Sequence, residues 1–214
     1  MDAASPSISP AVPRSLFALS VFYGGMVCIA GVLGNKQVAL GPLAVEAGIF
    51  AFLLLVVVSS AIAELHGEKT ANTLVRWGFV PLIASILLSL IVLAIPASPE
   101  MAPERVEAFG MIVGGTPRIW AGGIVAYGIS MSLNVLIFAR LRRSSGKLLW
   151  LRGAVASAMS QAVDTLIFVT IAFYGVFPIG ELMLGQMVAK IALSLVVVPL
   201  LITACVGIGR KLDS

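Results

Sequence analysis

Residues 152–168 read Arg-Gly-Ala-Val-Ala-Ser-Ala-Met-Ser-Gln-Ala-Val-Asp-Thr-Leu-Ile-Phe, inside a longer apolar run. Within them Ser157, Ser160, Gln161 and Asp164 follow at i, i+3, i+4 and i+7, which is one face of an α-helix. An ionised carboxylate in hydrocarbon costs several kcal/mol unless it is paired or hydrated. The stretch therefore predicts a membrane-spanning helix whose polar face is turned towards a bundle interior, a cavity or a cation.

The composition of the whole chain indicates the same class. Of its 214 residues, 59% are hydrophobic and 11% are charged, and its mean hydropathy is +1.07, so it is far more apolar than a soluble domain. The apolar runs are about 20 residues long, enough for a helix to cross roughly 30 Å of hydrocarbon, and they lack the alternation of a membrane barrel. We therefore expect an all-α, polytopic protein of the lipid bilayer.

The apolar runs predict six transmembrane helices. They cover residues 16–33, 43–64, 73–95, 119–140, 153–176 and 183–208. Together they form one transmembrane domain at 16–210, and residues 1–15, which are rich in Ser, Pro and Ala, are expected to be a disordered cytoplasmic tail. Both cysteines, Cys28 and Cys205, fall inside spans, where a thiol behaves as a small apolar group.

Basic residues are concentrated between the fourth and fifth spans, at Arg140, Arg142, Arg143, Lys147 and Arg152. Short loops rich in Lys and Arg stay in the cytoplasm, and six spans put both termini on one side, so we predict an N-in, C-in orientation. The net charge of +4 is thus a topology signal and no sign of nucleic-acid binding. Six spans also divide into two halves of opposite topology, which makes a 3+3 inverted repeat a candidate organisation.

Polar side chains at membrane depth are few, and two of them carry charge. At 1.5 Å per helical residue, Asp164 and Lys190 both lie on the order of 10 to 17 Å below the outer boundary. Antiparallel neighbouring spans can bring them together, and an ion pair would resolve the desolvation of both. The pair can be purely structural, but charges inside a membrane usually mark a pathway, which favours a functional role.

Two further candidates have ready structural explanations. Asn134 follows a face of small residues on the fourth span and can contact a substrate or bond to another helix. Glu64 lies at the cytoplasmic end of the second span, where a carboxylate can simply reach water. The sequence has no metal-ligand spacing, ATP-binding loop, nucleophile elbow or zinc-protease motif. We therefore predict no enzyme and no cofactor.

Several segments match one family of membrane proteins when they are taken together. They are Glu64-x-x-Gly67 leading to Ala71, Pro117-Arg118-Ile119, the Arg152 to Ser157 segment, Ser160-Gln161-x-x-Asp164-Thr165 with Phe168, and Lys190. As a set, over roughly residues 20–205, they resemble the queuosine-precursor transporter family of the bacterial inner membrane, also called the vitamin-uptake-type or VUT family. The resemblance implies import of deazaguanine precursors of the tRNA nucleoside queuosine.

This cargo suggests roles for the polar residues. A deazaguanine carries a ring N–H beside an exocyclic amine, and a carboxylate such as Asp164 or Glu64 can accept both, by the geometry used to read bases. Phe168 can stack on the ring, and Lys190 can hold Asp164 while the site is empty. The candidate substrate-binding residues are Asp164, Gln161, Ser160, Asn134, Glu64, Phe168 and Lys190.

Ser60 and Asn134 stand where the family usually has Asp, and His66 stands where Tyr is common. Three alternatives therefore stay open: a carrier for another vitamin-like solute, a substrate-binding subunit that needs a separate ATPase, and a membrane scaffold without transport. The expected partners are a small-molecule substrate and the bilayer, and a second copy of the chain is a candidate for a homodimer.

Overall fold

The computed structural model describes residues 12–41, 43–115, 117–145, 148–175 and 179–214. Of the expected disordered tail, residues 1–11 lie outside the described residues, as does Lys147 of the basic loop. The helices of the described part are α1 Arg14–Leu33, α2 Gly48–His66, α3 Glu68–Ala94, α4 Pro103–Val113, α5 Pro117–Ser145, α6 Leu149–Phe173 and α7 Gly180–Asp213.

Six helical segments in the described part of the chain are long and apolar enough to cross a membrane. The short helix α4 is not a span of its own, because it belongs to the same segment as α5. This confirms the predicted polytopic helical fold. Helix α2 lies at the centre, because it contacts α1, α3, α5, α6 and α7. Helix α3 instead exposes apolar side chains such as Leu87, Leu88 and Ile91 along its length. In water these would be unfavourable, but they suit a lipid-facing surface.

A β-hairpin that the sequence analysis did not anticipate lies between α1 and α2. Strands β1 Gln37–Leu40 and β2 Leu43–Glu46 pair antiparallel, with Gln37 opposite Glu46. Gly41 adopts a φ of 60° at the turn, which favours glycine. Helix α2 therefore begins at Gly48, five residues after the start expected from hydropathy, because a short apolar strand and the first turn of a helix have the same hydropathy.

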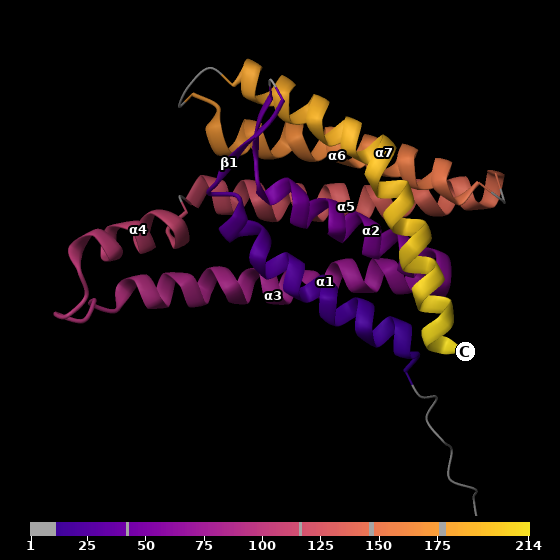
Figure 1. Cartoon of the computed structure of the whole chain (residues 1–214), viewed down its shortest axis with the longest axis horizontal. Helices are drawn as coiled ribbons and strands as arrows, with labels where there is room; N and C mark the ends of the chain where they lie inside the picture. The colour runs from indigo at the N-terminus through magenta and orange to yellow at the C-terminus, as the bar shows by residue number, and fades with distance from the viewer. Residues whose placement is uncertain (1–11, 42, 116, 146–147, 176–178) are drawn as a thin grey trace, which may run out of the picture.

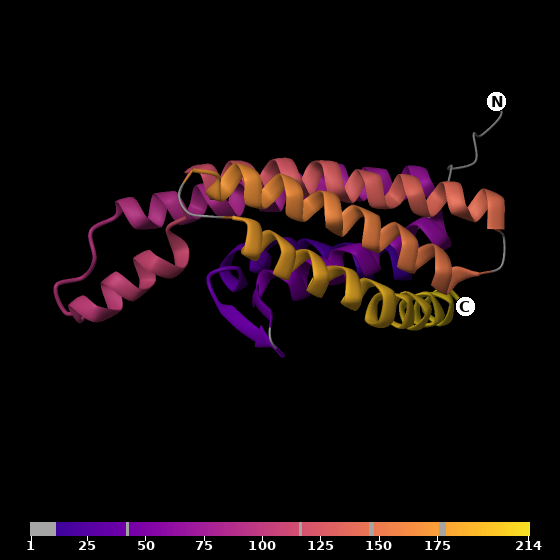
Figure 2. The same ribbon diagram turned by 90° about the horizontal axis from the view of Figure 1, so that it is seen from above.

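The two ends of the bundle differ in what they contain (Figure 1). The end that we call the terminal end holds the start of α1 and the end of α7, which are joined because the Ser15 amide donates to Asp213 at 2.9 Å. The opposite end, the hairpin end, holds β1, β2 and α4 (Figures 1 and 2). The ion pair of Arg143 with Glu68, 3.0 Å apart, places this part of the basic segment at the terminal end. The assignment of this end to the cytoplasm, and the inverted repeat, stay predictions.

Candidate functional site

A cavity of about 530 Å³ lies at the hairpin end of the bundle. It is lined by the hairpin, by the end of α4, and by the parts of α1, α2, α3, α5, α6 and α7 that are nearest to the hairpin. Most lining residues are apolar or aromatic, and a few polar groups interrupt them. A volume of this size with a mostly apolar wall is typical of a small-molecule site.

A buried ion pair forms part of the cavity wall. The Lys190 ammonium of α7 lies 2.8 Å from Asp164 Oδ2 of α6, and the two side chains are only 6% and 5% exposed. The Ser130 hydroxyl of α5 donates to the other oxygen, Oδ1, at 3.1 Å. Lys190 also lies 5.8 Å from the ring centre of Phe52, within the range of a cation–π contact. Both Asp164 oxygens are therefore engaged by the protein itself.

A second carboxylate, Glu46, lines the same cavity from β2. It makes no ion pair or hydrogen bond with any residue of the described part of the chain. Burial raises the pKa of its carboxyl to about 7; the Lys190 charge opposes this rise and the Asp164 charge adds to it. Glu46 is not among the residues predicted from the sequence, because residue 46 falls at the start of an expected spanning helix. An acid just after a Gly-containing turn, before a long apolar run, was the available signal.

Of the other predicted residues, only Phe168 lines the cavity. The Asn134 amide donates to the hydroxyls of Ser59 and Ser60 at 3.1 Å each, so it joins α5 to α2. Ser160 donates to a carbonyl of its own helix. Gln161 is fully buried, and neither atom of its side-chain amide has a hydrogen-bond partner in the structure. On α6 it comes one turn before Asp164, towards the terminal end.

Glu64 belongs to a separate cluster. Its carboxylate lies 3.4 Å from the Arg142 guanidinium and 3.3 Å from that of Arg152. Arg152 is buried, and its guanidinium lies 5.3 Å from the centre of the Phe138 ring. Arg152 precedes Asp164 by twelve residues on α6, about 18 Å along the helix. The structure therefore does not bring Glu64 to the cavity.

The comparisons with known proteins identify the class to which this bundle belongs. The model of a family described as "Putative vitamin uptake transporter" matches residues 46–204. The chain belongs to this family. The resemblance seen in its motifs is thus confirmed, and the protein is a multi-pass membrane transporter.

A curated protein is also similar to this chain. The relative, from Bacillus subtilis (strain 168), is named "Probable queuosine precursor transporter". It is 29% identical over 187 residues, which cover 85% of this chain and 80% of the relative. No solved structure matches the chain.

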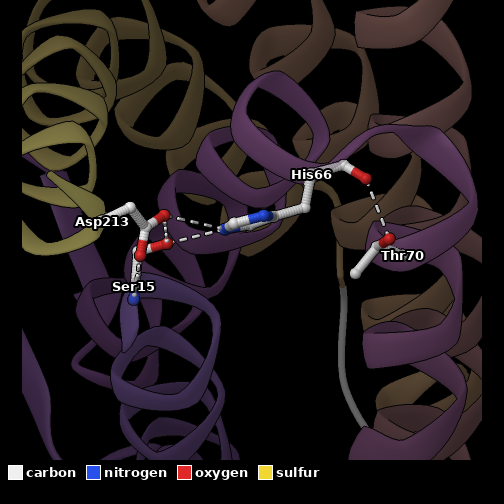
Figure 3. A network of polar contacts seen from close by, with 4 residues as sticks. All are labelled: Ser15, His66, Thr70 and Asp213. Carbon is white, nitrogen blue, oxygen red and sulfur yellow. Dashed lines mark hydrogen bonds and ion pairs between the residues drawn. The ribbon is translucent and has the colours of Figure 1, made fainter. Parts of the chain in front are cut away.

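At the terminal end of this transporter, a polar network contains residues of four helices, α1, α2, α3 and α7 (Figure 3). The Ser15 hydroxyl of α1 donates to Asp213 Oδ2 of α7 at 2.6 Å and lies 2.7 Å from His66 Nε2 of α2. Thr70 donates to the His66 carbonyl at 2.9 Å. A catalytic Ser–His–Asp arrangement places the imidazole between the other two groups. Here the serine lies between the imidazole and the carboxylate. The order differs from that of a catalytic triad, so we interpret the network as a contact that holds the helices together.

Proposed function

We propose that this transporter imports a queuosine precursor of the 7-deazaguanine type, and that the cavity at the hairpin end is its binding site. The observation that carries the proposal is the buried Asp164–Lys190 pair on the wall of a 530 Å³ cavity. Two charges at membrane depth that face a cavity mark a substrate site more often than a structural contact. The name of the Bacillus relative supports this cargo.

The cavity offers the groups that such a cargo needs. A deazaguanine is flat, and Phe168 and Trp120 present rings on which it can stack. Two of the Lys190 N–H groups remain after the bond to Asp164 and can donate to a ring carbonyl. Gln186 also lines the cavity, and its buried amide oxygen has no hydrogen-bond partner in the structure, so it can accept an N–H of the substrate.

The residues between the cavity and the terminal end form the second half of the proposed route. Gln161 and the Asn134 carbonyl oxygen are buried polar groups without partners, which is costly unless another conformation or a ligand satisfies them. In alternating access they would meet the substrate when the terminal end opens. With the terminal end in the cytoplasm of an inner-membrane protein, this direction is inward, and Ser160 and Glu64 lie along the same route.

The test measures queuosine in tRNA. A bacterium that cannot make the precursor and lacks its own importer is given trace 7-deazaguanine precursor and expresses the parent protein or Asp164→Ala. We expect the parent to restore queuosine and the variant to abolish restoration, while both reach the membrane in equal amounts. Glu181→Ala is the matched control, because Glu181 is an exposed acid at the start of α7. Full restoration by Asp164→Ala would contradict the proposed site.

The description of the family favours a second candidate cargo, another small vitamin-like solute. The same assay separates the two, because a protein that reaches the membrane but restores no queuosine contradicts the deazaguanine cargo. Uptake by the purified protein in liposomes then distinguishes an autonomous carrier from a subunit that needs an ATPase. A homodimer remains part of the proposal, and crosslinking in the membrane tests it.

A further inference from the structure

The two carboxylates of the cavity differ in what they already bind. Asp164 has one oxygen on the Lys190 ammonium, at 2.8 Å, and the other on the Ser130 hydroxyl, at 3.1 Å. Glu46 has no such partner among the described residues. An acid that lines a largely apolar cavity without a partner is costly, and a ligand with N–H donors would remove that cost. Glu46 is therefore the carboxylate of the cavity that has both oxygens available as acceptors.

The backbone holds Glu46 in a fixed place. It is the last residue of β2, opposite Gln37 of β1, and the next amide, of Ala47, donates to the Lys36 carbonyl at 2.7 Å. A Cβ atom on Gly34, the residue after α1, would lie 3.5 Å from Glu46 Oε1, which is an ordinary van der Waals distance, so the carboxylate lies close to the end of α1. The side chain thus sits at the closed base of the hairpin, where α1 and α2 flank it.

The charges and donors around the cavity match one pattern of ligand groups. Lys190 neutralises Asp164, and Glu46 is left as two acceptor oxygens. A guanine-type edge presents, in order, an exocyclic amine, a ring N–H and a carbonyl oxygen, which are two donors and one acceptor. Glu46 can accept from the two donors while a free N–H of Lys190 donates to the carbonyl. No rearrangement of the Asp164–Lys190 pair is needed.

We propose that Glu46 selects the substrate by accepting its adjacent ring N–H and amine, while Asp164 stays with Lys190. This inference rests on the proposed function and assigns its specificity to a residue of the hairpin. An amine-bearing flat heterocycle would bind, and the same ring without the amine would lose one of the two bonds. Sites built to bond a substrate N–H reject analogues that lack it, because the protein acceptor is then left unpaired.

The protonation of Glu46 makes the selection sensitive to pH. The charged and titratable groups that share its cavity are Lys190 on α7, Asp164 on α6, Cys28 on α1 and Tyr127 on α5. With its pKa raised to about 7, the carboxyl is ionised above this pH and protonated below it. The protonated acid has an O–H in place of one acceptor. Affinity for the guanine-type edge should therefore fall as the pH drops through 7.

The experiment compares two probes on the purified full-length protein by calorimetry: 7-deazaguanine and 7-deazahypoxanthine, which lacks the exocyclic amine. We expect the parent to bind 7-deazaguanine about 10- to 100-fold more tightly, the discrimination typical of a bidentate contact to a base. Glu46→Gln should bring the two affinities to within a few-fold and remove the change in affinity between about pH 8 and pH 6. Glu46→Asp, which keeps the charge, should retain a preference.

Glu181→Gln is the matched control, since it makes the same chemical change at an exposed acid. Preference kept in Glu46→Gln but lost in Asp164→Asn would overturn the inference, because Asp164 would then read the edge. Equal affinity of the parent for both probes would overturn the selection while leaving the cargo standing. A parent that binds neither probe contradicts the proposed cargo itself, and the selection falls with it.

Discussion

The hairpin end and the terminal end of this transporter use polar residues in opposite ways. At the hairpin end, Glu46 and the pair of Asp164 with Lys190 face a cavity. At the terminal end, Glu64 lies between two guanidiniums and Asp213 accepts both bonds from Ser15. The first arrangement leaves the Glu46 carboxylate for a ligand. The second joins helices through ion pairs and hydrogen bonds, although Glu64 Oε2 and two nitrogens of Arg152 have no hydrogen-bond partner in the structure. A cavity at one end and ion pairs at the other fit one of the two states that the proposed alternating access requires.

Helix α2 takes part in both groups of polar contacts at the terminal end. It contributes His66 to the network with α1 and α7, and Glu64 to the cluster with α5 and α6. Polar contacts at this end thus join the central helix α2 to α1, α5, α6 and α7. At the hairpin end, by contrast, the charged groups form their polar contacts mainly among α5, α6 and α7.

The largest effect is expected from breaking the pair at the cavity. Asp164→Asn removes the ion-pair partner of the buried Lys190 ammonium, which should lower the free energy of unfolding by about 3–5 kcal/mol. The double variant Asp164→Asn with Lys190→Met removes both charges and should regain most of this loss, since a buried pair adds little net stability. Thermal unfolding in detergent measures both changes.

Uptake separates a structural role of this pair from a functional one. If the pair serves only the fold, the folded double variant should take up substrate at the rate of the parent protein. We expect the double variant to fold and not to transport, because the substitution Lys190→Met removes the ammonium that would donate to a substrate carbonyl. Normal uptake by the double variant would move the site away from Asp164 and Lys190.

A smaller loss of stability is expected from the terminal end. Glu64→Gln removes the only countercharge that the described residues offer to the buried Arg152, and should cost about 2–3 kcal/mol. Glu68→Gln is the matched control, since its partner Arg143 is 78% exposed, and an exposed pair contributes less than about 1 kcal/mol. The measurement is the unfolding midpoint of each variant in the same detergent. Equal losses in both variants would contradict a fastening role for Glu64.

The polar face of α6 and the similar depth of Asp164 and Lys190 could be predicted from the sequence, because both follow from helical geometry. Residues on one helix face can be read directly, and 1.5 Å per residue puts Asp164 and Lys190 at one level. In the structure the two groups are indeed an ion pair.

Glu64 and Glu46 show which positions depend on tertiary structure that the sequence does not reveal. The pairing of Glu64 with Arg152 joins α2 to α6 across the fold, and neither helix alone indicates it. Glu46 depends on a hairpin whose four-residue strands are too short for periodicity to distinguish from a helix. The folded chain brings β2 against α7, and this long-range contact creates a cavity wall that no local pattern contains.

The smallest expected effect tests the Ser15 network. Ser15→Ala removes the hydroxyl that donates to Asp213 and contacts His66, while the backbone bond from residue 15 to Asp213 remains. A loss of about 1 kcal/mol is typical for one such hydroxyl, which corresponds to roughly five-fold faster local opening. Amide hydrogen exchange at the start of α1 should therefore accelerate about five-fold, with no change near the hairpin. Ser214→Ala is the control, because that hydroxyl bonds only within its own turn. If exchange at the start of α1 is unchanged in Ser15→Ala, the helices at this end are held by apolar packing, and the contrast between the two ends then rests on the Glu64 cluster alone.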